Sequence, residues 1–272
     1  MCDYEYLEER ARQIRRDIME MAYKAPGTSH PGPALSCADI MAVLYFHHMN
    51  IRPQEPRWEE RDRFVLSKGH ACPALYAALA ERGFFSKEHF YQFRGIHGIL
   101  QGHPDLKKTS GVDMTSGSLG NGVCAAAGMA YALKLKGNPA QVYALVGDGE
   151  SQEGMVWECA LLAPKLQLDN LTIIIDYNHF QSCGATDDII SMEPYADKWR
   201  AFDWRVVEMN GHNIPEIVSR LEEARGFRGR PTVIIAHTVK GKGVSFMEHN
   251  NEWHSKRPTE TQYVHAMAEL ES

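Results

Sequence analysis

The chain has little of what marks nucleic-acid-binding, membrane or secreted proteins. Lys and Arg total 29 against 35 Asp and Glu, which gives a net charge of −6. Without a basic excess, general binding to a phosphate backbone has no electrostatic basis. The aliphatic runs are short, and none approaches the roughly 18 apolar residues of a membrane span. Because charges occur throughout the first twenty residues, we expect no secretory signal and a cytoplasmic protein.

Paired cysteine motifs are also missing. No two of the six cysteines form a CxxC pair, which excludes a zinc clip and a thioredoxin-type redox motif. Cys124 and Cys159 lie in apolar segments, where a thiol serves as a small apolar side chain. We therefore expect reduced cysteines.

The hydrophobic pattern predicts an α/β fold. A length of 272 residues suits one large α/β domain or two small ones. There is no internal repeat, low-complexity tract or linker, which favours one domain over residues 1–272. Continuous aliphatic runs indicate strands covered on both faces, and helical patterns lie between them. The predicted strands are 63–67, 142–147, 171–176, 204–209 and 232–237; the predicted helices are 4–24, 37–49, 71–83, 152–166, 214–226 and 259–272. This alternation predicts a doubly wound, mostly parallel sheet flanked by helices.

Two loops stand out. The prolines and glycines of 25–33 argue against any regular element there. Residues 95–117 are long, glycine-punctuated and rich in His, Pro and Asp, which is typical of a functional or mobile loop.

Polar residues follow two of the predicted strands. Asp148 ends the strand at 142–147 and is flanked by Gly147 and Gly149, and Asn178 follows the next strand. In parallel sheets ligands bind beyond the carboxyl ends of the strands, so these side chains should share a crevice. A carboxylate and an amide oxygen suit Mg²⁺, and the flanking glycines with a helix opening near Gln152 suit a phosphate. The pattern predicts a site for a diphosphate and its metal.

Each half of this pattern alone is weak. Gly-Asp-Gly is also an ordinary turn, and an Asn after a strand is often only a turn former. A dinucleotide site is disfavoured because Gln152 stands where GxGxxG needs its third glycine. The two halves together, each at the end of a strand, are more specific.

The combination of GDG with an Asn about thirty residues later resembles the thiamine diphosphate motif of the transketolase-like enzymes. SHPGPALSCADIM is similar to the family's SGHPG segment, VLSKGHACPALY to VLSxGHxxxxLY, and QGHPD to its GHPE loop. TSGSLGNG resembles TGxLGxG, GDGESQEGMVWE resembles GDGxxxEGxxxE, and DYNHFQSCG resembles DxNxxQxxG. A closing segment that ends in WH completes the series. The matches follow the family's order over residues 29–254.

The resemblance implies a thiamine diphosphate site with a metal. It implies that Asp148, Asn178 and the backbone carbonyl of Phe180 hold Mg²⁺, for which Ca²⁺ or Mn²⁺ could substitute. The remaining implied cofactor contacts are Gly147, the Gly149 N–H and His70 for the diphosphate, and Gly117 and Leu119 for the aminopyrimidine.

Two acidic residues are implied at the dimer interface. Glu153 and Glu158 resemble family carboxylates that link the two cofactor sites, and we expect them on one face of a helix. A solvated acidic face is the alternative.

Four of the 13 histidines, His30, His70, His103 and His254, stand where the family's motifs themselves have His. His30 and His103 lie in HP turns on loops expected over the strand ends, and ketol transfer needs proton transfers near neutral pH, which suit imidazole. The resemblance implies that His30 and His254 move protons while His103 binds the donor's first hydroxyls.

The chain departs from the family pattern at a few positions. Ser118 replaces a common Pro, Ser255 replaces Gly, and Ser182-Cys183 replaces an apolar residue and an acid. These changes concern loop detail and substrate fit and leave the metal and diphosphate residues intact.

Nothing resembling the family's pyrimidine-binding domain, with its activating glutamate, follows His254. The resemblance therefore implies the N-terminal subunit of a split transketolase of pentose phosphate type, active only with a partner chain in a heterotetramer of two plus two. One alternative is a subunit that decarboxylates a 2-oxo acid, of 1-deoxyxylulose-phosphate synthase or 2-oxo acid dehydrogenase type. A non-catalytic subunit is the other.

Overall fold

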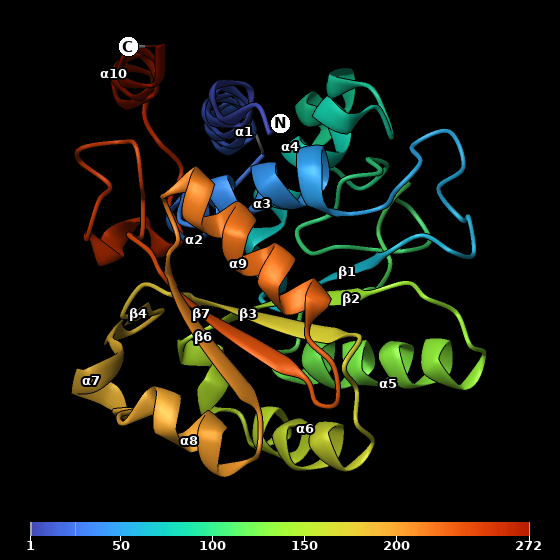
Figure 1. Cartoon of the computed structure of the whole chain (residues 1–272). Helices are drawn as coiled ribbons and strands as arrows, with labels where there is room; N and C mark the ends of the chain where they lie inside the picture. Colours follow the sequence, from blue (N-terminus) through green and yellow to red (C-terminus); the bar gives the residue numbers. More distant parts are fainter. Residues whose placement is uncertain (1, 25, 272) are drawn as a thin grey trace.

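The protein is built around one parallel sheet. The computed structural model describes residues 2–24 and 26–271. Five strands pair in parallel in the order β1-β2-β3-β7-β6. They are β1 (Arg63–Leu66), β2 (Val142–Gly147), β3 (Leu171–Tyr177), β6 (Arg205–Asn210) and β7 (Thr232–His237), with a small separate hairpin of β4 (Phe180–Gln181) and β5 (Gly184–Ala185). Helices cover both faces, so the predicted doubly wound parallel sheet is confirmed (Figure 1).

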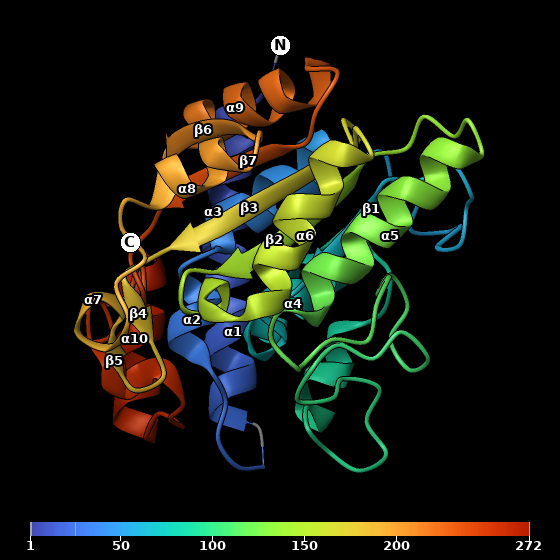
Figure 2. The ribbon, with the colours of Figure 1, turned by 90° about the horizontal axis from the view of Figure 1, so that it is seen from below.

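The helices form two layers (Figures 1 and 2). One layer contains α1 (Tyr4–Lys24), α2 (Pro31–Leu35), α3 (Ala38–Val43), α4 (Cys72–Arg82), α9 (Ile214–Gly226) and α10 (Glu260–Glu271). The other contains α5 (Asn121–Leu135), α6 (Gly154–Lys165) and α8 (Tyr195–Ala201), and the short α7 (Thr186–Ile189) follows the hairpin. The π-helical turn Leu44–His48 extends α3, and 3-10 turns occupy Gly69–Ala71, Lys87–Gln92, Gly149–Gln152 and Asn251–His254.

Alternate residues of each strand enter two separate cores. On β3, Ile174 packs into the core beneath α1, α3 and α4, whereas Ile173 and Ile175 pack into the core of α5, α6 and α8. Successive side chains of a strand point to opposite faces, so both sets must be apolar when both faces are covered. This explains why the strands read as continuous aliphatic runs.

Most predicted elements are confirmed to within one or two residues, including the strands and α1, α4, α6 and α9. Residues 95–117 contain no helix or strand, as expected. The expectation for 25–33 is wrong, because Pro31 begins α2 with His30 as its N-cap residue. Proline fits the first turn of a helix because the N–H that it lacks has no helical acceptor there. Ala25 and Ser272, at the edges of two predicted segments, lie outside the described residues.

Three helices besides α2, namely α5, α7 and α8, are absent from the sequence-based expectations. Helix α5 is rich in Ala and Gly, so its apolar stripe stands out weakly in the sequence. The short helices α7 and α8 lie in a stretch between β3 and β6 that carries little helical periodicity.

All six cysteines are free. In the described part of the chain, every helix is too short or too polar to cross a membrane.

Gly122 allows α5 to approach the end of β1. A Cβ at this position would lie 2.6 Å from the Cα of Ser67, whereas a Cβ at Gly128 of the same helix meets nothing within 4 Å. We expect Gly122→Ala to lower the free energy of unfolding by about 1–3 kcal/mol through overpacking, measured by urea denaturation. Gly128→Ala is the matched control and should stabilise by up to about 1 kcal/mol. Equal effects of the two substitutions would contradict the close approach.

Candidate active site

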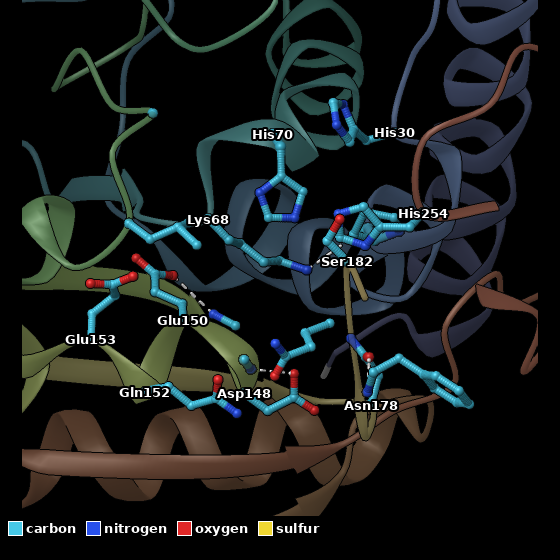
Figure 3. A pocket seen from close by; sticks show the side chains of 17 residues that line it. His30, Lys68, His70, Asp148, Glu150, Gln152, Glu153, Asn178, Ser182 and His254 are labelled. Atoms are coloured by element: carbon cyan, nitrogen blue, oxygen red, sulfur yellow. Dashed lines mark hydrogen bonds between the residues drawn. The ribbon is translucent and has the colours of Figure 1, made fainter. Parts of the chain in front are cut away.

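A pocket of about 370 Å³ opens at the carboxyl ends of β1, β2 and β3 (Figure 3). Parallel strands place the residues that follow them at the same edge of the sheet, which brings together segments far apart in the chain. The lining residues are His30, Pro33, Lys68, His70, Gly117, Leu119, Gly147, Asp148, Gly149, Glu150, Gln152, Glu153, Asn178, Phe180, Gln181, Ser182 and His254. Most residues proposed from the sequence therefore share one cavity.

The neighbouring strands β2 and β3 bring Asp148 and Asn178 together. Gly147 pairs in register with Asp176, so the residues after each strand lie side by side. Asp148 and Asn178 are both buried and both line the pocket. The expectation that they share a crevice is confirmed.

Asp148 is a buried carboxylate that pairs with no cation in the described part of the chain. It accepts hydrogen bonds from the backbone N–H groups of Gly149, at 2.7 Å, and His179, at 2.5 Å. Among the described residues it forms no ion pair, and burial together with the nearby Asp176 raises its pKa to about 7. A buried carboxylate in this state favours a bound cation, which would supply the missing positive charge.

The local geometry suits a hard cation and a phosphate. The Asn178 amide donates through Nδ2 to Asp176 Oδ2 at 2.9 Å, which fixes the position of its oxygen. No group of three His, Cys, Asp or Glu side chains in the described chain could hold a metal, so amide and carbonyl oxygens, such as those of Asn178 and Phe180, would have to complete a site here. At Gly149 a Cβ would lie 2.6 Å from the Cβ of Gln181, so only glycine leaves this part of the cradle open.

Asp176, unlike Asp148, is fully compensated. It forms a buried ion pair with Lys68, which also donates to the Pro33 carbonyl at 2.8 Å. Ser36 Oγ at 2.6 Å and Thr238 Oγ1 also donate to this carboxylate. Burial alone would raise the pKa of Asp176, but the Lys68 ammonium and these hydrogen bonds hold it below its usual value.

Glu150 is a second buried acid. It accepts from Ser67 Oγ at 2.5 Å and from the N–H groups of Gly120 and Gly147 at 2.9 and 3.0 Å. Burial raises its pKa. Glu150 therefore ties the turn before α5 to the end of β2.

Three histidines form a cluster at the pocket. The ring centroids of His30 and His70 lie 5.3 Å apart, those of His30 and His254 5.7 Å, and those of His70 and His254 5.2 Å. Burial is the largest cause that lowers each pKa, to about 4 for His30 and about 3 for His254, and in the same direction for His70. All three rings are therefore neutral near pH 7.

Other predicted residues lie elsewhere. His103 is outside the pocket lining and packs beside Gly117, where a Cβ would lie 3.4 Å from the ring. The expectation that Glu153 and Glu158 share a helix face is wrong. Glu153 precedes α6 with an extended backbone and lines the pocket, while Glu158 is exposed within α6 and outside the pocket. The 3-10 turn of 149–152 comes before α6, which begins only at Gly154. Glu153 therefore lies outside the helix and does not share a helical face with Glu158.

Sequence reasoning missed two charged residues that line the pocket, Lys68 and Glu150, and two that contact lining residues from behind, Asp176 and Lys240. Lys68 stands in the quoted KGH motif. Asp176 ends an aliphatic run, and this position was a signal that its carboxylate is buried. Glu150 also stands in a quoted motif, GDGESQEGMVWE, but neither Glu150 nor Lys240 carried a sign of burial, because a charged residue in a glycine-containing loop is usually solvated.

Comparisons with known proteins agree with this geometry. Residues 8–267 match the family described as transketolase, thiamine diphosphate binding domain. The chain is 46% identical to the 6-deoxy-6-sulfo-D-fructose transketolase subunit SqwG of Clostridium sp. strain MSTE9, over 97% of this chain and 96% of that protein. It is 40% identical to an apulose-4-phosphate transketolase subunit of Phocaeicola vulgatus, over 98% of this chain and 94% of that protein.

The fold also matches solved structures. The transketolase of Campylobacter jejuni superposes with a TM-score of 0.92 at 33% identity, over 99% of this chain and 43% of that one. The chain thus spans about two fifths of the length of the solved transketolases that it matches.

The state of Asp148 predicts a pH dependence of stability. Between about pH 4 and pH 7 its raised pKa makes the folded chain bind a proton that the unfolded chain has lost, so this group destabilises the fold increasingly as pH rises. Relative to the wild type, Asp148→Asn should gain up to about 1.4 kcal/mol of unfolding free energy per pH unit from pH 5 to pH 7 without divalent cations. Urea denaturation of both chains over this range tests it. The histidines contribute equally to both, so a constant difference would refute the assignment.

The Lys68–Asp176 pair predicts a large loss of stability. Lys68→Met leaves Asp176 buried without its counter-charge, which should cost about 3–5 kcal/mol in unfolding free energy. Lys134→Met is the control, because the Lys134–Asp169 pair is partly exposed and should contribute about 0–1 kcal/mol. Thermal and urea unfolding measure both, and similar losses would argue against a special role for the buried pair.

Proposed function

Because the chain belongs to the transketolase family through its thiamine diphosphate-binding domain, we propose that it is the N-terminal subunit of a split transketolase. The reaction is transfer of a two-carbon ketol unit from a ketose phosphate to an aldose phosphate. The observation that carries the proposal is that one pocket joins the Asp148–Asn178 pair to a cluster of neutral histidines. A diphosphate-metal site beside groups that can hold protons is what this chemistry requires.

The strand ends would hold the cofactor and its metal. Asp148, Asn178 and the carbonyl of Phe180 would bind Mg²⁺, and the other contacts to thiamine diphosphate would come from Gly117, Leu119, Gly147, Gly149 and His70. When bound, thiamine diphosphate supplies the carbon nucleophile and electron sink that ketol transfer needs. The Gly149 N–H, which donates to Asp148 Oδ1 at 2.7 Å, would also be the donor to the diphosphate.

The histidines would handle the protons of the sugar. Their lowered pKa values keep His30 and His254 uncharged at neutral pH, so each can accept or donate at a sugar hydroxyl. His103, beside Gly117 at the edge of the pocket, would bind the first hydroxyls of the donor.

A separate chain would complete the enzyme. Two relatives whose names call them transketolase subunits are covered over 96% and 94% of their length, as expected for one component of a pair. We infer that the partner carries the pyrimidine-binding domain and the activating glutamate. The complex would contain two copies of each chain and act in the cytoplasm.

Exposed apolar side chains on α5 and α6 support such a partner. Leu135 of α5 and Leu161 and Leu162 of α6 are 70%, 64% and 52% exposed, and the two leucines of α6 follow the exposed Glu158 closely in sequence. Large exposed apolar side chains on adjacent helices are typical of a protein interface. Glu153 and Glu158 would lie at this interface and connect the two cofactor sites.

Native mass spectrometry tests the assembly. The tagged chain is purified from its own host's extract with Mg²⁺ and thiamine diphosphate present. We expect a heterotetramer with a second chain and two bound cofactors, and Asp148→Asn should assemble without retaining them. A lone chain or homodimer without cofactor would contradict the proposal.

Donor assays on the purified complex test the reaction. Fructose 6-phosphate and its 6-sulfo analogue, each with an aldose phosphate acceptor, should yield ketol transfer, and pyruvate should not be decarboxylated. Robust transfer by the single chain, or turnover of pyruvate, would refute the split-transketolase assignment.

A further inference from the structure

Lys240 is a buried cation behind the pocket wall, where it contacts the lining residues Gln181 and His254. It follows β7 and Thr238, is 1% exposed, and forms no ion pair among the described residues. Its ammonium group has three hydrogens and meets three acceptors: Asn251 Oδ1 at 2.6 Å, His254 Nδ1 at 3.0 Å and the Gln181 carbonyl at 3.5 Å. A protonated lysine can only donate, so the direction of each bond is determined.

The neighbouring amide agrees with this direction. Asn251 Nδ2 donates to the Ser182 carbonyl at 3.1 Å, which leaves Oδ1 of the same amide as the acceptor for Lys240. The lysine is therefore held between a fixed amide and an imidazole ring. Burial lowers the pKa of Lys240 to about 8, which keeps most of it protonated at neutral pH.

His254 differs from the other histidines of the site. In the described chain the ring nitrogens of His30, His70 and His103 form no hydrogen bond, so nothing in the protein selects their tautomers. The His254 ring instead accepts from Lys240 at Nδ1, and a neutral ring that accepts at Nδ1 carries its hydrogen on Nε2.

We propose that Lys240 is a positioning residue that locks His254 in the Nε2–H tautomer, so that His254 presents a hydrogen-bond donor to the sugar. Resting on the proposed function, this inference divides the two catalytic histidines into a donor and an acceptor. His254 donates to a sugar oxygen. His30, whose ring lies edge-on to His254 and is free to take either tautomer, accepts a hydroxyl proton.

Nitrogen NMR of the full-length chain tests the inference directly. With ¹⁵N-labelled histidine, long-range ¹H–¹⁵N correlations at pH 7.5 distinguish protonated from unprotonated ring nitrogens, and the signals lost in His254→Gln identify His254. We expect an unprotonated Nδ1 and a protonated Nε2. In Lys240→Met both His254 nitrogen shifts should move toward the average of two tautomers.

Lys242→Met is the matched control. Lys242 lies in the same segment but pairs with Glu248 at the surface, so its removal should leave the His254 shifts unchanged. A wild-type His254 with a protonated Nδ1 would overturn the inference without any variant, even if Lys240→Met fails to fold. Unchanged His254 shifts in a folded Lys240→Met chain would also overturn it.

The measurement needs no cofactor, partner or turnover. A negative NMR result would therefore overturn the tautomer assignment alone. The split-transketolase proposal is tested separately, by the assembly and donor assays.

Discussion

The buried ion pair between Lys68 and Asp176 is the contact on which the pocket depends. It joins the turn after β1 to the end of β3 and, through the Pro33 carbonyl, to α2. Two charges removed from water are tolerated only when their remaining hydrogen-bonding capacity is also satisfied, and here Ser36 and Thr238 contribute to that. The strand ends are thus held in one arrangement.

This network also places the functional residues. His70 stands two residues after Lys68, Asn178 two after Asp176, and Lys240 two after Thr238. A side chain two positions from a fixed anchor has little freedom to leave the pocket. The polar interior of the sheet edge therefore supplies the rigidity that a cofactor site needs.

Two carboxylates on adjacent strands have opposite electrostatic states. Asp176 has its counter-charge inside the protein, so its pKa lies below the usual value. Among the described residues Asp148 has only backbone N–H partners, and its pKa rises. Asp176 therefore stabilises the fold, whereas Asp148 can bind an external cation. The same residue type thus takes two roles because the surroundings differ.

The sequence indicated the five strands of the main sheet, several of the helices and the order of the motifs, but not α2, α5, α7 or α8. Continuous aliphatic runs identified the strands, because a strand covered on both faces must be apolar on both. Since neighbouring parallel strands end at the same edge of the sheet, the residues after β2 and β3 were expected to meet there. Which charges are paired depends on the folded arrangement of the chain. Lys68 and Asp176 are 108 positions apart, and nothing local to either residue marks the other as its partner. The tautomer of His254 likewise depends on Lys240, which comes from the end of another strand. Periodicity reports the face on which a residue lies, but hydrogen-bond partners and protonation depend on groups that only folding brings within about 3 Å.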